Sequence, residues 1–341
     1  MMNKFTIQNT EFEISTNIKN SISINSHPEK YEVVFQKLNN SYTEDQVLIV
    51  DKNVHKLYNI NHSKMIVIDA IEQNKSIETV LDICEKLLEY NFNKAQTLIV
   101  IGGGIIQDLG AYTAKTYKRG VNWIYYPTTL LSQCDSCIGG KTALNFKNYK
   151  NQLALFSAPQ KVIIDIDFLK TLKPEDITSG YGEIVKLFLI GGSYYINNIN
   201  EFDYKTSIYH SLLIKKAVIE HDEFELMERK SLNYGHSFGH VIEPLFNYEI
   251  PHGEAVMLGI EIINRLFTKD KSITNIISKY TNLEKIKHID IERLINGLKT
   301  DKKVKNNIIS LVVLMNPGNT IFVEQEINDE LKKRVYEIFA N

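Results

Sequence analysis

The chain has 341 residues, more than a single hydrophobic core usually serves, so two domains are expected. Its composition, 43% hydrophobic and 23% charged, is typical of a soluble globular protein. The net charge of -2 excludes the overall basic field of proteins that bind nucleic acid or anionic membranes. No apolar run reaches the roughly 18 residues of a membrane span, and the first residues lack a signal-peptide stretch, so we expect a cytoplasmic protein.

Short apolar runs alternate with helical patterns in the first half of the chain. Residues 76–90 have helical spacing, and a second helix is predicted from the glycines at 102–104 to about residue 115. Strands that alternate with helices indicate an α/β fold with a mostly parallel, doubly wound sheet, which binds ligands beyond the carboxyl ends of its strands. The predicted strands are residues 47–50, 65–68, 97–101, 123–126 and 162–164.

The pattern changes near residue 172. Helical periodicity dominates from there, and Pro174 followed by two acidic residues is a helix-start signal. Strand-like runs return in a short hairpin predicted near residues 308–322. We therefore predict an N-terminal α/β domain of residues 1–172 and a mainly helical C-terminal domain of residues 173–341.

Three cysteines, Cys84, Cys134 and Cys137, are too few and too badly spaced for a disulfide framework. Cys134 and Cys137 form a C-x-x-C pair with two interpretations. One is a redox or zinc pair, and the other is two small buried residues near a helix start. We favour the second.

The glycine triplet at 102–104 follows a predicted strand and opens a helix. Backbone N–H groups at such a turn can face a pyrophosphate, and the helix dipole favours the anion. Glycine triplets also form plain turns, which is the alternative. Asp108 follows on the first turns of the helix, and Asp51 and Asn53 end an earlier strand, where they serve either ribose hydroxyls or a capping turn.

Three of the nine histidines fall within seventeen residues. His236 and His240 share one face of a helix because they are four residues apart, and His252 follows a turn. A catalytic zinc-like ion needs three protein ligands and an open position, and a carboxylate can be one of the three. Glu183 is the best candidate, with Lys186 three residues later on the same face; a solvated ion pair is the alternative reading of those two.

Basic residues recur beside glycines and amides at residues 118–120, 139–141, 150–151 and 215–229. Arginine binds phosphate or carboxylate through two hydrogen bonds, so these runs favour a small anionic substrate. The alternative for most of the lysines is a solvated charged face.

In this order and spacing the motifs resemble those of the 3-dehydroquinate synthase family, from about residue 48 to about residue 318. The matching runs are GGGIIQD at 102–108, YKRG at 117–120, PTTLLSQCDS at 127–136, GGKT at 139–142, KN at 150–151, EIVK at 183–186, LNYGHSFGH at 232–240 and HGE at 252–254.

The resemblance implies an NAD-binding α/β domain followed by a helical metal domain. It implies that a divalent zinc or cobalt ion is held by Glu183, His236 and His252. The implied NAD contacts are Asp51, Asn53, Glu72, Lys75, Gly103, Gly104, Asp108, Thr128, Thr129, Lys141, Lys150, Phe168, Thr171 and Leu172. The implied catalytic and substrate-binding residues are Asp135, Lys141, Asn151, Lys186, Lys215, Arg229, Asn233 and His240, with one lysine of the pair Lys302 and Lys303. Arg119 would reach the substrate phosphate of a neighbouring subunit, which implies a homodimer.

Enzymes of this family convert 3-deoxy-D-arabino-heptulosonate 7-phosphate into 3-dehydroquinate and phosphate, so the resemblance implies a phosphate-eliminating carbon–oxygen lyase of the shikimate pathway. NAD⁺ oxidises a ring hydroxyl, phosphate leaves, the hydride returns, and an intramolecular aldol step closes the carbocycle. The metal would polarise the oxidised oxygen, and the protein would mainly position groups and stabilise charge.

Related cyclases act on sedoheptulose 7-phosphate or glucose 6-phosphate, which lack the carboxylate of the heptulosonate. Arg229 and Asn233 stand where the family holds that carboxylate, which favours a carboxylate-bearing substrate. A paralogue that uses an amino analogue stays open, because the chain departs from the family pattern at Gln107, Tyr149, Ala154, Gly182 and Phe188.

Two functions of other kinds stay as alternatives. A metal-dependent polyol dehydrogenase on the related two-domain fold would release NADH, whereas a cyclase regenerates NAD⁺; the GGKT run and the pair Arg229 and Asn233 argue against it. A non-catalytic binding paralogue would be expected to lack a ligand or a catalytic lysine, and here all three proposed ligands are present.

Overall fold

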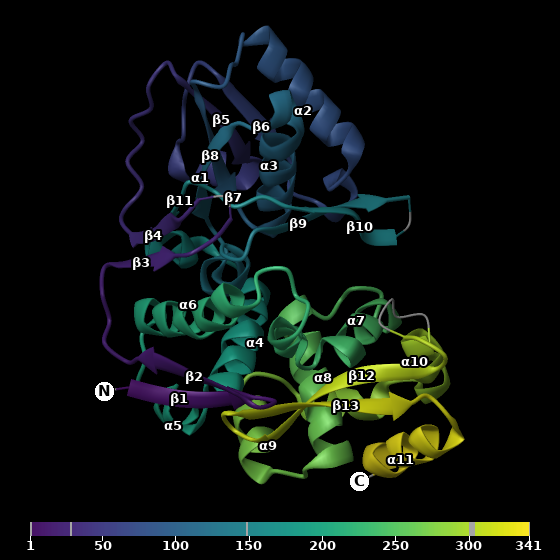
Figure 1. Cartoon of the computed structure of the whole chain (residues 1–341). Coiled ribbons are helices and arrows are strands. Elements are labelled where there is room, and N and C mark those ends of the chain that lie inside the picture. Colours follow the sequence, from purple (N-terminus) through teal and green to yellow (C-terminus); the bar gives the residue numbers. More distant parts are fainter. Residues whose placement is uncertain (1, 28, 148, 300–303, 341) are drawn as a thin grey trace. The chain divides into compact units, whose positions relative to one another are not determined.

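The computed structural model describes residues 2–27, 29–147, 149–299 and 304–340. Its contacts divide the chain into two compact units (Figure 1). The α/β unit comprises the described residues of 19–173, and the helical unit comprises those of 1–18 and 174–341. Lys302 and Lys303, one of which was predicted to bind substrate, lie outside the described residues.

The α/β unit is built on a seven-stranded sheet with the order β3-β4-β11-β8-β7-β5-β6. All neighbouring strands in it are parallel except β3 and β4, which are antiparallel. The strands are β3 (Ser21–Ile24), β4 (Tyr31–Phe35), β5 (Gln46–Asp51), β6 (Met65–Ile68), β7 (Thr97–Gly102), β8 (Asn122–Pro127) and β11 (Lys161–Ile164).

Helices and a separate hairpin accompany this sheet. The helices are α1 (Lys52–Tyr58), α2 (Ile77–Glu89) and α3 (Gly104–Thr116), and the antiparallel hairpin is β9 (Lys141–Phe146) with β10 (Tyr149–Phe156). Strands β5 and β7 are buried along nearly their whole length, as expected of parallel strands that are covered on both faces. Their apolar side chains form the core of the unit with Phe168, which is 1% exposed.

The helical unit carries its own four-stranded sheet with the order β12-β13-β1-β2. Its strands are β1 (Met2–Ile7), β2 (Thr10–Ser15), β12 (Ile308–Asn316) and β13 (Asn319–Glu326). The helices are α4 (Pro174–Gly191), α5 (Ser193–Asn198), α6 (Tyr204–His221), α7 (His236–Leu245), α8 (His252–Phe267), α9 (Lys271–Ile277), α10 (Ile291–Lys299) and α11 (Asp329–Ala340).

The first eighteen residues differ from the sequence prediction, which assigned them to the N-terminal domain. Strand β1 pairs in parallel with β13, and its side chains Phe5 and Ile7 are buried in the helical unit. A parallel pair between strands about 300 residues apart leaves no signal in local periodicity, since each strand alone has only an alternating pattern. The unit boundary after residue 173 lies one residue from the predicted boundary.

The strands and helices predicted for the first half all form, with ends within a few residues of those expected, and the hairpin near residues 308–322 forms as β12 and β13. The sequence analysis missed β1 to β4 and the hairpin β9–β10, which are short or carry polar residues on an exposed face. Within the described residues, no helix combines the length and the apolar character that crossing a bilayer requires.

Candidate active site

In the helical unit, the backbone of α8 lies unusually close to the backbone of α4 and to that of Gly235 at the start of α7. A side-chain carbon at Gly182 in α4 would lie 2.1 Å from the carbonyl oxygen of Gly253 in α8, so the two backbones touch there. Gly235, which precedes α7 and has a φ of +79°, makes a similar contact with Gly259 of α8. Only glycine allows backbones to approach so closely. The next residue after Gly182 is Glu183, and the next after Gly235 is His236.

These crossings bring together the three predicted metal ligands. The Oε1 atom of Glu183 lies 3.2 Å from Nε2 of His252 and 3.5 Å from Nε2 of His236. His240 belongs to the same cluster, because one ring nitrogen from each of His236, His240 and His252 lies within 4.8 Å of the others. Imidazole nitrogens with one carboxylate oxygen are the donor set that zinc or cobalt takes in a catalytic site. The residues present therefore fit such an ion.

Glu183 also forms an ion pair with Lys186 one turn later in α4. Both side chains are about 2% exposed, so the solvated ion pair considered from the sequence does not describe them. A buried ammonium group needs such a partner, because an unpaired charge in the interior is costly. The pair places a lysine beside the carboxylate that faces the histidines.

The surroundings of His252 are strongly acidic. Burial alone would lower the pKa of His252, but hydrogen bonds to Glu183 and Glu243 and their negative charges outweigh it and raise the pKa to about 10. Glu243 Oε2 lies 3.4 Å from Nδ1 of His252. A carboxylate on the second ring nitrogen fixes the orientation of an imidazole whose first nitrogen serves a metal.

Arg229 and Asn233, the predicted carboxylate-binding pair, lie on one 3-10 helix, Glu228–Asn233. Arg229 is 2% exposed, and its guanidinium donates to the backbone carbonyl of Glu223. Nδ2 of Asn233 donates to Oε1 of Glu225 at 2.6 Å. Both side chains thus donate hydrogen bonds to the preceding loop of residues 222–228.

Asp222 fixes that loop. Its carboxylate accepts hydrogen bonds from the backbone N–H groups of Leu226, Met227 and Arg229 at 2.8 to 3.0 Å. These bonds hold the pKa of Asp222 below its usual range, although burial opposes the shift. Lys215, another of the predicted basic residues, lies on α6 and is 8% exposed.

The predicted cofactor residues of the α/β unit gather at the carboxyl ends of its strands. Gly103 and Gly104 open α3 directly after β7, and Thr128 and Thr129 directly follow β8. Asp51 caps α1 by accepting from the N–H groups of Asn53 and Val54 at 2.6 and 3.1 Å. The capping role considered from the sequence is therefore present at Asp51.

The remaining predicted cofactor and substrate residues of this unit are spread over its loops. Arg119, with a φ of +65°, ends the 3-10 helix Tyr117–Arg119 that follows α3, and Asp135 lies in the short π-helix Ser132–Ser136. Lys141 is the first residue of β9. Phe168 is buried in the core and meets the ring of Tyr58 edge-on, and the hydroxyl of Tyr58 lies 2.9 Å from Oγ1 of Thr171. Leu172 caps the end of the 3-10 helix Ile166–Thr171.

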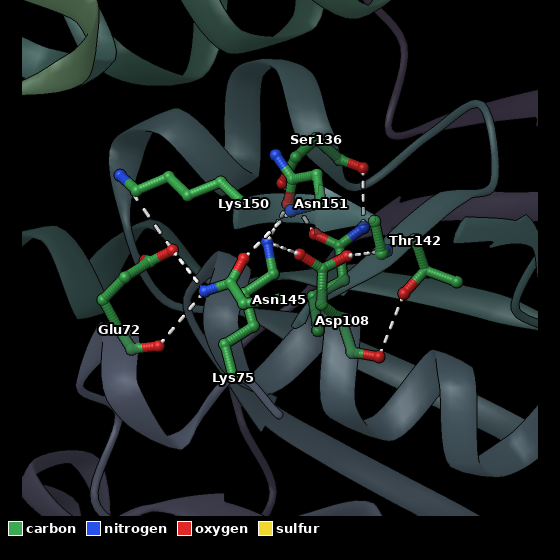
Figure 2. A network of polar contacts seen from close by, with 10 residues as sticks. Glu72, Lys75, Asp108, Ser136, Thr142, Asn145, Lys150 and Asn151 are labelled. Carbon is green, nitrogen blue, oxygen red and sulfur yellow. Dashed lines mark hydrogen bonds and ion pairs between the residues drawn. The ribbon is translucent and has the colours of Figure 1, made fainter. Parts of the chain in front are cut away.

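Six polar side chains form a connected network on this unit (Figure 2). Nζ of Lys75 lies 2.5 Å from Oδ2 of Asp108 and donates to Oδ1 of Asn151 at 2.8 Å. Asn145 bridges Asn151 and Glu72, and Lys150 approaches Glu72 at 4.0 Å. Four predicted cofactor residues and the predicted substrate residue Asn151 are thus joined.

Sequence reasoning missed Asn145. Its partners Glu72 and Lys75 lie about 70 residues away, so no local pattern signals the contact. An amide between the apolar residues Leu144 and Phe146 is the one feature that marks it in retrospect.

The buried-residue interpretation of the C-x-x-C pair agrees with the structure. Cys134 and Cys137 are both buried, and each thiol lies near a backbone carbonyl one turn earlier. Neither belongs to the cluster of possible metal ligands found among the described residues.

Two matches decide the family. The model of the 3-dehydroquinate synthase N-terminal family matches residues 65–179, and that of the 3-dehydroquinate synthase C-terminal family matches residues 180–304. The chain belongs to the 3-dehydroquinate synthase family. The 3-dehydroquinate synthase of Pelagibacter ubique is 34% identical over 92% of this chain and 98% of its own length. That of Clostridium acetobutylicum is 35% identical over 85% of this chain and 89% of its own length.

Solved structures share the fold. A 2-deoxy-scyllo-inosose synthase superposes with a TM-score of 0.78 at 20% identity, covering 93% of this chain and 99% of its own. The 2-epi-5-epi-valiolone synthase of Streptomyces hygroscopicus, solved with NAD⁺ and Zn²⁺ bound, gives 0.78 at 20% identity, covering 94% and 99%. A probable glycerol dehydrogenase from Sinorhizobium meliloti gives 0.56 at 11% identity, covering 86% and 90%. These likenesses confirm the predicted fold class.

Three departures from the 3-dehydroquinate synthase pattern have a structural explanation. Gly182 is required by its contact with Gly253. Phe188 is fully buried and packs against the rings of Tyr195 and Phe202 at 5.3 and 5.9 Å. Gln107 exchanges two hydrogen bonds with Ser136, of 2.6 and 2.7 Å, which tie α3 to the turn that carries Asp135. Nothing in the structure explains the residues at positions 149 and 154.

Proposed function

We propose that this chain converts 3-deoxy-D-arabino-heptulosonate 7-phosphate into 3-dehydroquinate and phosphate, as a phosphate-eliminating lyase that uses NAD⁺ and a zinc or cobalt ion. The observation that carries the proposal is the meeting of Glu183, His236 and His252 at the crossing of three helices, in a chain of this family. The same chain retains every charged side chain that the resemblance assigns to the substrate.

The cofactors supply reversible hydride transfer and polarisation of the oxygen that is oxidised and reduced. The protein's part is to hold them and to place charges. Glu183, His236 and His252 would hold the metal, and Glu243 would orient His252 through its second nitrogen. Lys186 would keep its ammonium group beside that centre, where negative charge develops on the substrate oxygen.

The substrate carboxylate is assigned to Arg229 and Asn233. Arg229 is buried, and its guanidinium already donates to the backbone carbonyl of Glu223, so it is held in place before substrate arrives. A preformed donor costs less entropy on binding than a mobile one. A sugar phosphate without a carboxylate would not use these two donors, which argues for the heptulosonate over sedoheptulose 7-phosphate.

The substrate phosphate is assigned to basic and amide groups of the α/β unit, among them Lys141 and Asn151, and to Arg119 of a neighbouring subunit. The proposal therefore includes a homodimer. Light scattering should give twice the chain mass of 39.3 kDa. A fully active monomer would refute the role given to Arg119.

A cytoplasmic location also stays a prediction.

A substrate comparison tests the assignment. Purified protein with NAD⁺ and Zn²⁺ or Co²⁺ is given 3-deoxy-D-arabino-heptulosonate 7-phosphate, an amino analogue of it and sedoheptulose 7-phosphate in parallel, and phosphate release is measured. We expect release from the heptulosonate at the highest rate. Preferred release from the amino analogue or from sedoheptulose 7-phosphate would keep the reaction type and assign the chain to another cyclase.

A further inference from the structure

The hairpin β9–β10 contains an irregularity opposite Asn145. Tyr149 pairs with Phe146 and Leu153 pairs with Leu144, so residues 150–152 of β10 all face the single residue Asn145. Such a bulge leaves backbone N–H groups without their ladder partners. Within it Asn151 has a φ of +56°, the left-handed region that residues other than glycine adopt at a cost.

The side chain of Asn145 supplies a hydrogen-bond acceptor for one backbone N–H of this bulge. Its Oδ1 accepts the backbone N–H of Asn151 at 3.0 Å. Its Nδ2 donates to Oε1 of Glu72 at 2.8 Å and to the backbone oxygen of Glu72 at 3.3 Å. Its own backbone N–H donates to the carbonyl of Lys75 at 2.8 Å. Every polar group that this asparagine offers toward the network is used, and the set fixes its amide in one orientation.

The chain of contacts closes on itself (Figure 2). The ammonium group of Lys75 contacts both the side chain of Asn151 and Oδ2 of Asp108. The other oxygen of Asp108 accepts a hydrogen bond of 3.2 Å from the backbone N–H of Ala143, two residues before Asn145. The side chain of Asn151 is therefore held at its oxygen by Lys75 while its backbone is held by Asn145. A closed ring of this kind resists displacement of any one member, because each is held by two others.

We propose that Asn145 is a positioning residue that joins the cofactor-binding segment, Glu72 to Lys75, to the substrate-binding bulge at Asn151, so that the two move as one unit. The inference rests on the proposed function, which assigns Glu72 and Lys75 to NAD⁺ and Asn151 to the substrate. Asn145 itself touches neither ligand in this account. When NAD⁺ binds and restrains Glu72 and Lys75, the hydrogen bonds of Asn145 to Glu72 and to the backbone of Asn151 restrain Asn151 as well. Binding of NAD⁺ therefore orders the bulge before substrate binds.

The substitution Asn145→Asp tests the link with little change of shape. It keeps an oxygen for the N–H of Asn151 but replaces the NH₂ group by an oxygen that repels the carboxylate of Glu72. We expect the KM for the heptulosonate and the Kd for NAD⁺ each to rise about tenfold, the loss typical of one charge-assisted hydrogen bond. The matched control is Asn122→Asp, the same change at an exposed position of β8.

Adding Glu72→Gln to Asn145→Asp reverses the direction of the hydrogen bond, because the amide at position 72 can donate to the carboxylate at position 145. At saturating NAD⁺, where a weakened contact of residue 72 with the cofactor no longer matters, the double variant should have a lower KM for the heptulosonate than Asn145→Asp alone. A residue that only stabilised the fold would show a lowered Tm in Asn145→Asp without this rescue. Failure of the double variant to improve on the single one, at equal Tm, would overturn the proposal.

Hydrogen exchange gives a readout that needs neither turnover nor a variant. In the wild-type protein NAD⁺ should slow exchange in peptides that cover residues 72–75 and also in those that cover residues 149–152; in Asn145→Asp it should slow only the first. Protection of residues 72–75 alone in the wild type would overturn the inference even if every variant fails to fold. If the wild type shows both protections but releases no phosphate from the heptulosonate, the proposed reaction falls and the link through Asn145 stands.

Discussion

Gly182 and Gly253 are in direct backbone contact: a side-chain carbon on Gly182 would lie 2.1 Å from the carbonyl oxygen of Gly253. Each glycine is the immediate neighbour of a proposed metal ligand, Glu183 in α4 and His252 in α8. The N–H of Gly253 also donates to Oγ of Ser179 at 3.1 Å, one turn before Gly182. The spacing of these two helices therefore sets the distance between two ligands.

The substitution Gly182→Ala should weaken metal binding. The added methyl group cannot fit without moving α8 away from α4, which would lengthen the 3.2 Å approach of Glu183 to His252. We expect the metal dissociation constant to rise about tenfold or more, in the range of changes to groups that orient ligands. Titration with Zn²⁺ against a competing chelator measures it.

The control for that substitution is Gly104→Ala in α3, where a side-chain carbon would have no atom within 4 Å. Alanine is favoured over glycine by about 1 kcal/mol in a helix interior, so a loss of metal affinity in Gly182→Ala would not come from helix propensity. Equal metal affinity of Gly182→Ala and wild type would show that the crossing does not set the ligand geometry.

Four side chains are candidates for three metal-ligand positions, and substitutions can show which three bind the ion. We assign Glu183, His236 and His252 to the metal and His240 to the substrate, although a ring nitrogen of His240 lies within 4.8 Å of those of His236 and His252. His252→Ala should abolish metal-dependent turnover and raise the metal dissociation constant at least about 100-fold, since a direct ligand matters more than its supports.

His240→Asn, by contrast, should keep wild-type metal content and lose kcat. Metal content after dialysis, measured by atomic absorption, distinguishes the two outcomes. Loss of metal from His240→Asn with retention in a Glu183→Gln variant would instead assign a three-histidine ligand set.

Arg229 should govern substrate affinity. Its replacement by alanine removes a buried guanidinium that is proposed to bind the substrate carboxylate, and we expect the KM for the heptulosonate to rise roughly 100-fold. Lys230→Ala is the matched control, because it removes the same charge from the next, exposed residue. Steady-state kinetics with both variants make the comparison. An unchanged KM in Arg229→Ala would contradict the carboxylate assignment.

The stability of the helical unit should fall in mild acid because of His210. Burial lowers the pKa of this side chain below its ordinary value of about 6.5, although a hydrogen bond to the carbonyl of Thr16 opposes the shift. Below pH 6.5 the unfolded chain therefore takes up a proton that the folded chain refuses. The free energy of unfolding should drop by up to about 1.4 kcal/mol per pH unit from this group as the pH falls below 6.5.

Urea unfolding between pH 7 and pH 5 measures that slope. In His210→Phe, which fits among the rings of Tyr195 and Phe202, the slope should be shallower than in the wild type. The same substitution at the exposed His288 should not reproduce the effect. Parallel slopes for wild type and His210→Phe would show that the group contributes nothing.

Local patterns predicted the elements that are buried and regular. The apolar runs of β5 and β7 and the helical spacing of α2 were visible in the sequence, and the clustered histidines pointed to a candidate metal site before any fold was known. What the patterns missed depends on distant partners. The pairing of β1 with β13 and the bridge from Asn145 to Glu72 join segments far apart in sequence, and neither leaves a periodic trace.

For two unusual residues, the sequence did not reveal why that residue type is present. Gly182 was identified as a departure from a family pattern, but its reason, contact with the backbone of Gly253, exists only once α4 and α8 are packed. Gln107 was likewise unusual, and its two hydrogen bonds to Ser136 appear only in the fold.

The measurement that tests the central claim most directly is the yield of phosphate per NAD⁺. Protein stripped of metal and reloaded with Zn²⁺ is mixed with an excess of 3-deoxy-D-arabino-heptulosonate 7-phosphate and an amount of NAD⁺ equal to the enzyme, while phosphate and absorbance at the NADH band are followed together. The account predicts many phosphates released per NAD⁺, formation of 3-dehydroquinate, and no accumulation of NADH. Accumulation of NADH in step with substrate consumption, without release of phosphate, would contradict it and identify a dehydrogenase.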